Sequence, residues 1–236
     1  MATTWKAPTW RMPNDKNQNK FENYSLDFNG SSNYLQVENF NGLAGKKNFS
    51  ISVWVNLDTY SGSNILGHVL NLHGSNNSTD IYVLFNGRTL LDVYIGNIAF
   101  RGTCTDPVSN WTNLIITFDG NIPSTQVLDR CKVWQDGNKL TNTNASNVSA
   151  VPSGADTLLI GKKAQGPQWF YHFLGKMSQL VIFDYTLTDG TNGTVDQISY
   201  LYNLNNPMAI TGVKPIASYL LGENASTGGD SSSTLS

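Results

Sequence analysis

The chain has 236 residues and a formal net charge of −2, and charged residues make up only 14% of it. That charged fraction is below the ~25% of an average globular protein. The net charge is close to zero, so the chain lacks the excess of basic residues that binds nucleic acid. Aromatic residues reach 11%, which argues against a disordered chain. No apolar run approaches the ~18 residues of a transmembrane helix, so no membrane insertion is expected. Residues 1–14 contain no apolar stretch that would predict a signal peptide.

The first segment, residues 1–23, is predicted to be an extended arm because two prolines interrupt it. Its residues Trp5, Trp10 and Met12 are too hydrophobic for a free tail. We therefore expect these side chains to anchor the arm, either on the same chain or on a second copy of it.

From residue 24 onward, short segments of alternating apolar and polar residues follow each other at even spacing, as in β-sandwiches and barrels. The clearest of them places Phe49, Ile51, Val53 and Val55 on one face. Asn-Gly and Asp-Gly pairs separate several segments and favour the positive φ that tight hairpins need. The predicted strands cover residues 24–28, 34–37, 49–56, 65–72, 81–85, 90–95, 98–101, 111–118, 131–135, 158–161 and 176–185.

One helix is predicted over residues 194–203. Thr194 and Gln197 fit a capping box, and apolar residues from Val195 to Tyr202 follow at helical spacing. Beyond it, we expect a C-terminal extension over 206–236, with one strand near 216–221 and a loose low-complexity tail. The sequence thus predicts an arm (1–23), a single sandwich domain (24–205) and this extension.

Four segments, in this order, resemble the laminin-G-like branch of the concanavalin A-like lectin/glucanase superfamily. They are LDFNGSSNYLQV at 26–37, NFSISVWVNL at 48–57, NWTNLIITFDG at 110–120 followed by CKVWQDGNKL at 131–140, and LLIGKK at 158–163 followed by FLGKMSQLVIFDYTLTDG at 173–190. The resemblance implies an all-β jelly-roll sandwich of two antiparallel sheets, with one short helix near the C-terminus. A short insertion at 190–193 departs from the family pattern, in which only a short connection precedes that helix.

Two flanking segments, TWRMPND at 9–15 and KPIASYLLGENAS at 214–226, resemble segments around such domains in phage and virus structural proteins, although in reversed order. This resemblance implies a structural or decoration protein of a virion that associates with itself or with other virion or surface proteins. We expect either that the two termini lie side by side or that the C-terminal strand completes a neighbouring subunit. The residues expected to mediate self-association are Trp5, Trp10, Met12 and Tyr219.

Catalysis is not predicted, and no residue is assigned a catalytic role. Glutamate and histidine each occur only three times, and the chain has neither a G-x-S-x-G motif nor the E-x-D-x-E or E-x-D-x-x-E motif of laminarinase-type glucanases. Glycosidases normally need two carboxyl groups at a fixed separation. We therefore expect a non-enzymatic protein, with a glycoside hydrolase as a remote alternative.

A carbohydrate-binding lectin that recognises surface glycans is the competing function, with an extracellular or cell-surface location in place of the virion. Two polar loops, 73–80 and 165–172, are rich in amides, and the second also carries aromatic side chains. For the second loop the alternative is packing in a protein interface. The candidate sugar-binding residues are Asn76, Asn77, Asp80, Trp169, Tyr171 and His172.

No cofactor is required by the sequence, and Ca²⁺ is the one that the resemblance allows. Some laminin-G-like domains hold Ca²⁺ at the sandwich rim, and Asp80, Asp106 and Asp156 are the candidate ligands, their alternative being solvated turn residues. A zinc site is not expected. His68 and His73 stand five residues apart on one strand and should face opposite sides.

The two cysteines, Cys104 and Cys131, lie close to strands that could be neighbours in the fold. Without an export signal we expect two thiols that act as small hydrophobic side chains. A disulfide between them is the alternative.

Overall fold

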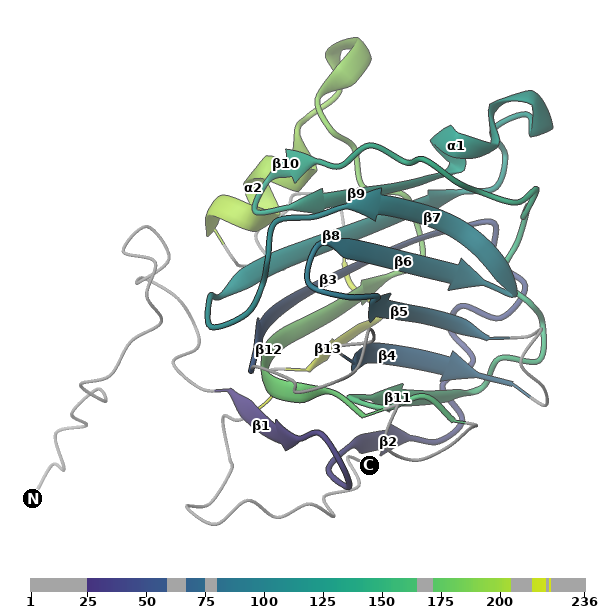
Figure 1. Ribbon diagram of the computed structural model, residues 1–236. Coiled ribbons are helices and arrows are strands. Elements are labelled where there is room, and N and C mark those ends of the chain that lie inside the picture. Colours follow the sequence, from purple (N-terminus) through teal and green to yellow (C-terminus); the bar gives the residue numbers. More distant parts are fainter. Residues whose placement is uncertain are drawn as a thin grey trace, which may run out of the picture.

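The protein is a sandwich of two antiparallel sheets (Figure 1), as the resemblance implied. The structure, a computed structural model, describes residues 25–58, 67–74, 80–164, 172–204, 214–219 and 221. Several predicted functional residues lie outside these ranges, and for them the predictions stand untested. They are Trp5, Trp10, Met12, Asn76, Asn77, Trp169 and Tyr171.

One sheet has seven strands in the order β1-β12-β3-β8-β9-β10, with β13 also paired to β12. All of these pairs are antiparallel. Its strands are β1 (Leu26–Asn29), β3 (Asn48–Leu57), β8 (Thr112–Asp119), β9 (Cys131–Gln135), β10 (Asn138–Lys139), β12 (Leu174–Phe183) and β13 (Ala217–Tyr219).

The other sheet has six strands in the order β2-β11-β4-β5-β6-β7, again antiparallel throughout. These strands are β2 (Leu35–Val37), β4 (Gly67–His73), β5 (Ile81–Phe85), β6 (Leu90–Ile95), β7 (Asn97–Thr103) and β11 (Thr157–Ile160).

The core lies between the two sheets because alternate side chains of each strand point inward. On β3, Phe49, Ile51, Val53 and Val55 belong to this core, as predicted from the alternation. The core also contains both cysteines, which are free and buried, so the expectation of two hydrophobic thiols is confirmed.

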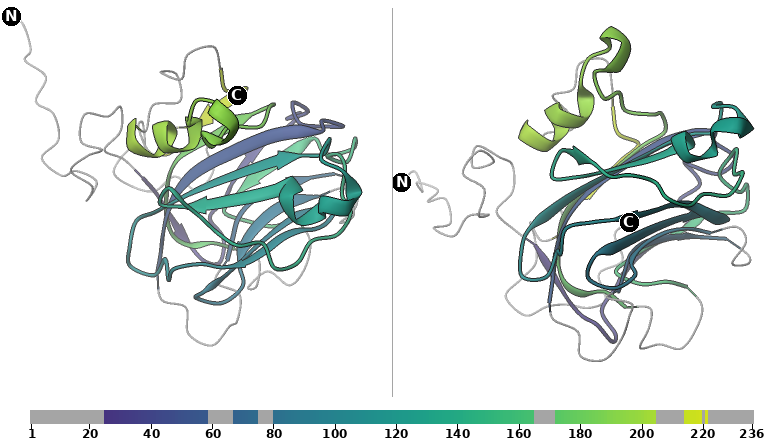
Figure 2. Two further views of the ribbon diagram at one scale, coloured as in Figure 1. Left: turned by 90° about the horizontal axis from the view of Figure 1, so that it is seen from above. Right: turned by 45° about the horizontal axis from the view of Figure 1, so that its top comes forward.

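A second, smaller cluster lies on the outer surface of the seven-stranded sheet, where the helix α2 (Gln197–Leu204) covers it (Figure 2). Ile198 and Leu201 of α2 pack there against the buried Trp134 of β9. The ring of Trp54 stacks on Tyr202, with 6.0 Å between their centroids. Within the described ranges, no helix is long and apolar enough to cross a membrane.

The predicted start of the helix is wrong by three residues. Asp196 caps α2, since its Oδ1 accepts a hydrogen bond from the Ser199 N–H at 2.9 Å. Thr194 instead donates its hydroxyl to the carbonyl of Thr191, and Val195 is 72% exposed. The cause is the insertion, which forms the 3₁₀ turn η5 (Thr191–Gly193) and delays the helix.

The prediction that His68 and His73 face opposite sides of their strand is also wrong. The pairing of β4 with β5 is irregular between His68 and Leu70, and the neighbouring residues Val69 and Leu70 both belong to the core. This bulge resets the alternation, so both histidines lie on the outer face of the six-stranded sheet. The described residues nevertheless contain no group of three or more His, Cys, Asp or Glu that could hold a metal ion.

The two ends of the described fold lie next to each other on β12. Leu26 at the start of β1 pairs with Met177, and Tyr219 at the end of β13 pairs with Leu180. β1 and β13 thus follow each other along one side of β12, separated by its irregularity at Ser178–Val181. The C-terminal strand thus pairs within its own chain, and Tyr219 packs against the core; the position of the termini themselves lies outside the described residues and stays a prediction.

Candidate functional site

A group of aromatic and charged side chains covers the outer face of the six-stranded sheet. We call it the tyrosine face and define it by Tyr34, Tyr82, Tyr94, Asp92, Arg101, Lys162 and Lys163. In β5 and β6 the core residues alternate with outward-facing ones, and Tyr82 pairs directly with Tyr94. Their rings stack with 4.4 Å between centroids and 15° between planes, and each ring is partly exposed. Such cross-strand aromatic pairs are stabilising and rigid.

Two lysines reach this face from the segment that follows β11. Asn71 of β4, which is fully buried, fixes that segment, because its Oδ1 accepts the Ala164 N–H at 2.8 Å. The Lys163 Nζ then lies 4.5 Å from the centroid of the Tyr82 ring. The Lys162 Nζ lies 4.3 Å from that of Tyr34. Both ammonium groups are within cation–π range and are held beside aromatic rings.

An ion pair borders the tyrosines on β6 and β7. Asp92 and Arg101 are direct cross-strand partners, and two hydrogen bonds join them, Nε to Oδ1 at 2.7 Å and Nη2 to Oδ2 at 2.6 Å. Asn86 donates a further bond to the Asp92 carboxylate. The Asp92 carboxylate is 1% exposed, whereas the Arg101 side chain is 33% exposed. The pair therefore presents guanidinium donors to solvent and keeps its carboxylate inside.

Two buried histidines support the aromatic rings. The His68 ring lies 5.7 Å from Tyr82, and the His172 ring lies 6.3 Å from Tyr34. Burial, followed by the nearby charges of Lys163 and His172, lowers the pKa of His68 to about 3. His68 is therefore neutral at physiological pH and contributes packing to the face, not charge.

The structure brings two of the predicted sugar-binding residues, Asp80 and His172, to the border of this face. Asp80 is fully buried and accepts hydrogen bonds from His73 Nδ1 at 2.9 Å and from the Gly74 N–H at 3.2 Å. Burial lowers the pKa of Lys163, and the charge of Asp80 partly opposes this effect. His172 pairs with Lys162 in an isolated antiparallel bridge. The described ends of the two predicted loops, Asp80 and His172, therefore lie near the two lysines.

The other candidate calcium ligands lie apart from each other. Asp106 accepts bonds from Arg88 and from the Val108 N–H, and these bonds lower its pKa although burial alone would raise it. Asp156 is exposed and donates its N–H to the carbonyl of His73. Calcium binding at these residues stays a prediction.

None of the residues that define the tyrosine face was foreseen as functional, whereas Asp80 and His172 at its border were. The sequence does indicate part of this face. Tyr82 and Tyr94 each stand between two apolar residues of a predicted strand, so their side chains are expected to face away from the core. The charged groups of the face are engaged in an ion pair or held beside aromatic rings, and this arrangement suits binding better than acid–base chemistry.

The comparisons with known proteins agree with the fold. Residues 29–191, more than half of the chain, match the Laminin_G_3 family model, described as the concanavalin A-like lectin/glucanases superfamily. A search of curated proteins finds no match.

Three solved structures are similar to this one at low sequence identity. A heptameric SAP-like pentraxin from Limulus polyphemus has a TM-score of 0.57 and 13% identity, and the match covers 85% of this chain and 92% of that one. A proposed carbohydrate-binding protein from Bacteroides ovatus has a TM-score of 0.59 and 14% identity, over 85% of this chain and 52% of that one. Domain 4 of an extracellular GH43 arabinanase from Geobacillus stearothermophilus, in complex with arabinotriose, has a TM-score of 0.50 and 20% identity, over 75% of each chain.

At these identities the solved structures show the fold alone. The family model, the order of the matching strands and the two-sheet architecture all agree. The chain therefore belongs to the laminin-G-like branch of the concanavalin A-like lectin/glucanases superfamily.

Proposed function

We propose that the domain is a non-enzymatic carbohydrate-binding module and that the tyrosine face is its ligand-binding surface. The observation that carries this proposal is the partly exposed stack of Tyr82 on Tyr94 with the Lys163 ammonium group over it. The exposed parts of these rings offer apolar surface against which the C–H groups of a sugar can pack. Two similar structures, a proposed carbohydrate-binding protein and a domain bound to arabinotriose, support the choice of ligand class.

The polar groups of the face complement the rings. Ammonium groups of Lys162 and Lys163 and the guanidinium of Arg101 donate hydrogen bonds, which sugar hydroxyls accept. Each of these cations is already held in place by a ring or by Asp92. Less conformational entropy is therefore lost when a ligand binds.

The test is a glycan array probed with the full chain, followed by calorimetric titration with arabino-, gluco- and galacto-oligosaccharides. We expect Tyr82→Ala to weaken binding roughly tenfold, because it removes half of the aromatic stack. Tyr200→Ala is the matched control, since Tyr200 is exposed on α2, away from this sheet. Equal affinity of the Tyr82→Ala variant and the unaltered protein would refute the proposal. Release of reducing sugar from the same oligosaccharides would refute its non-enzymatic part.

A role in a virion is the second candidate function, in which the domain associates with itself or with other particle proteins. The flanking segments at 9–15 and 214–226 motivate it, and the heptameric state of the similar pentraxin supports self-association on this fold. Light scattering tests it. A trimer or larger assembly that dissociates when residues 1–22 are deleted is the expected result, and a monomer at all concentrations would count against assembly through the arm. The alternative location is the cell surface or the extracellular space.

A further inference from the structure

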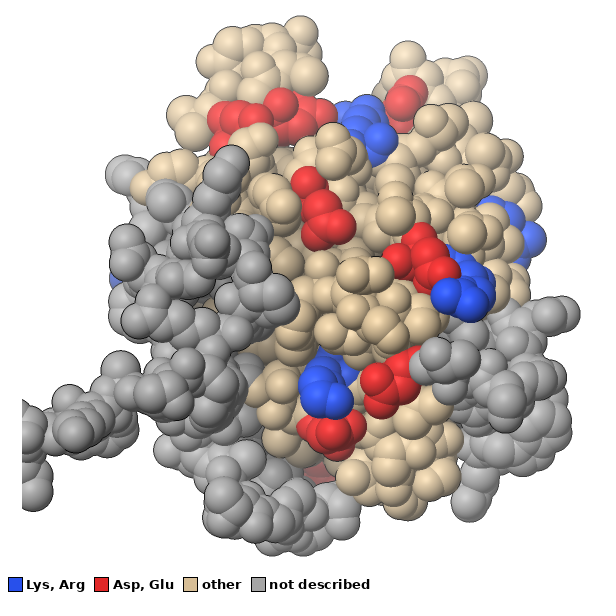
Figure 3. Space-filling view, turned by 60° about the vertical axis from the view of Figure 1, so that its left-hand side comes forward, with Lys and Arg blue, Asp and Glu red and all other residues tan. Residues whose placement is uncertain are grey.

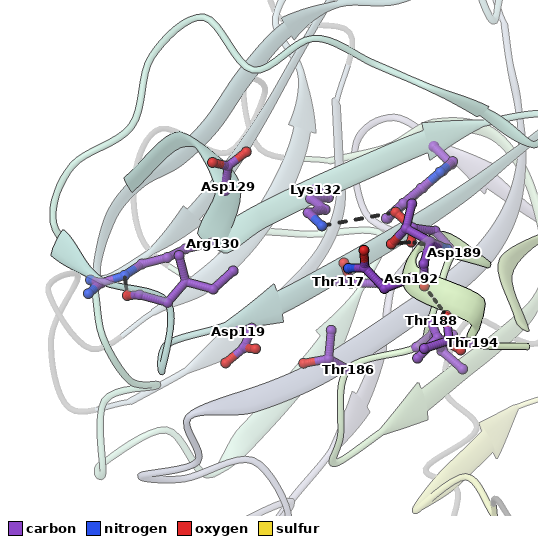
Figure 4. A pocket seen from close by; sticks show the side chains of 14 residues that line it. Thr117, Asp119, Asp129, Arg130, Lys132, Thr186, Thr188, Asp189, Asn192 and Thr194 are labelled. Atoms are coloured by element: carbon purple, nitrogen blue, oxygen red, sulfur yellow. Dashed lines mark hydrogen bonds and ion pairs between the residues drawn. The ribbon is translucent and has the colours of Figure 1, made fainter. Parts of the chain in front are cut away.

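A polar pocket of about 170 Å³ lies on the opposite sheet, over the outer surface of β8 and β9 (Figure 4). The floor is formed by outward-facing residues of these two strands, among them Thr117 and Lys132, which are direct cross-strand partners. The short helix α1 (Val127–Arg130), preceded by the 3₁₀ turn η3 (Ser124–Gln126), borders one side. Residues 186–194 border the other side.

A hydroxyl group on the floor of the pocket can bind a ligand. Thr117 is 1% exposed as a residue and lines the pocket. A threonine hydroxyl donates one hydrogen bond and accepts others. A polar group that enters the pocket can therefore exchange a hydrogen bond with it.

The rim is rich in hydrogen-bond acceptors and carries more negative than positive charge. Carboxylates of Asp119, Asp129 and Asp189 line it, and one ammonium group, that of Lys132, lies 4.0 Å from Asp189. Partial burial would raise the pKa of Asp189, but hydrogen bonds from Thr191 and the nearby lysines lower it, so the group stays ionised.

Arg130 also lines the pocket, and its guanidinium points away from Asp189 in Figure 4; with it the lining still has one carboxylate more than it has cations. It donates at 2.6–2.7 Å to the carbonyls of Ile122 and Val148 and to Asn147 Oδ1. The pocket therefore disfavours anions and favours a ligand with several hydrogen-bond donors.

The wall formed by residues 186–194 is fixed by its own hydrogen bonds. Thr191 Oγ1 donates to Asp189 at 2.6 Å, and Asn48 donates to Thr186 Oγ1 at 3.0 Å. Gly190 and Asn192 adopt left-handed backbone conformations, with φ of 76° and 56°. This wall contains residues 190–193, the insertion by which the sequence departs from the family pattern.

We propose that this pocket binds one uncharged sugar ring, as a second site that does not depend on the tyrosine face. Its volume is well below the ~300 Å³ at which pockets for drug-sized ligands begin, so a single ring fits and an oligosaccharide does not. Apolar side chains of Ile122, Trp134 and Leu187 lie beside the polar rim. A sugar ring has the matching character, with an apolar C–H face and hydroxyl groups at its edge.

The test is an NMR titration of the ¹⁵N-labelled full chain with methyl glucoside, methyl galactoside and methyl arabinoside. We expect saturable shifts of the amides of Thr117, Lys132 and Asp189 with at least one of them. Thr117→Val keeps the shape of the side chain and removes the hydroxyl, and it should weaken binding roughly threefold to tenfold. Thr141→Val, at an exposed loop position, is the matched control and should change nothing.

Two further variants distinguish this proposal from the proposal for the tyrosine face. Tyr82→Ala should leave the shifts at Thr117 and Lys132 intact, whatever its effect on oligosaccharide binding. Asp189→Asn offers a second variant if Thr117→Val disturbs the fold. Shifts confined to β4–β7, or no saturable shifts with any methyl glycoside, would overturn the proposal. Equal affinity for glucuronate and methyl glucoside would overturn the argument from charge.

Discussion

His68, which lies against Tyr82 of the tyrosine face, contributes to the stability of the fold in a way that depends on pH. The imidazole is 2% exposed and lies beside Tyr82, and burial is the main reason that its pKa falls to about 3. In the unfolded chain the same group titrates near 6.5. Between these two values the unfolded chain binds more protons than the folded one.

We therefore expect the free energy of unfolding to fall as the pH decreases from 6.5 towards 3. The stability associated with neutral His68 is fully present well above pH 6.5, and its loss amounts to at most about 1.4 kcal/mol per pH unit. Urea unfolding between about pH 7.5 and 5 measures this pH dependence of the free energy of unfolding. The range is chosen because ordinary carboxyl groups titrate below it. The control is His68→Gln, which should flatten this dependence. An unchanged slope in the variant would show that another group is responsible.

At the scale of elements, β12 holds the seven-stranded sheet together because it pairs with β1, β3 and β13. Gly175 permits its close approach to β3. The residue has a φ of +133°, and a Cβ atom there would lie 2.2 Å from the carbonyl oxygen of Asn56 and 2.9 Å from the Leu57 Cα. Both neighbours are backbone atoms that cannot move without separating the strands.

Gly175→Ala should therefore destabilise the domain by several kcal/mol, on the order of 3–5. Gly45→Ala is the matched control, because Gly45 also has a positive φ of +70° but no other atom within 4 Å of an added Cβ. The free energy of unfolding of that variant should fall by only about 1 kcal/mol, because only the backbone at residue 45 is strained. Thermal or urea unfolding compares the two. Equal losses would mean that the contact with β3 is unimportant.

The elements that the sequence predicted best are those bounded by local turn signals. The strands Ile81–Phe85, Leu90–Ile95 and Cys131–Gln135 have the predicted bounds, because alternation and adjacent Asn-Gly or Asp-Gly pairs fix them locally. The bulge in β4 was not predictable in this way. Its extra residue is accommodated by pairing with another strand, which alternation within one segment does not reveal.

The tyrosine face was predictable only in its aromatic part. Alternation places Tyr82 and Tyr94 outside the core, but their contact depends on the register of the hairpin between them. Lys162 and Lys163 reach the face because Asn71 binds the Ala164 N–H across 93 residues of sequence. No local pattern carries that information.

At the scale of the whole molecule, the two thiols report on the integrity of the sandwich. Cys131 is fully buried and Cys104 nearly so, both within the core between the sheets. Burial raises the pKa of Cys104 to about 12, although a backbone hydrogen bond partly offsets it, and burial also raises that of Cys131. Neither thiol forms appreciable thiolate at neutral pH, which is the reactive form.

We expect a thiol reagent such as Ellman's reagent to modify neither cysteine in the native protein and both in denaturant. At high reagent concentration the rate of modification should equal the rate of global unfolding. Rapid modification of one thiol in native buffer would show local opening of the core near that residue.

On the side shown in Figure 3, the charged side chains of the described residues occur in small groups, some of both signs and some acidic only, on a largely uncharged surface. Binding on that part of the surface is therefore expected to depend only modestly on ionic strength, because no large group of one charge forms there among the described residues.

The placement of β1 and β13 end to end along β12 has a mechanical consequence. A load applied between Leu26 and Tyr219 would draw each strand off β12 from the end that lies nearest the other, so hydrogen bonds would break one after another and not all at once. Peeling of this kind needs far less force than shearing two strands past each other. A tether attached at those two points would make the sandwich a weak link that yields early under tension.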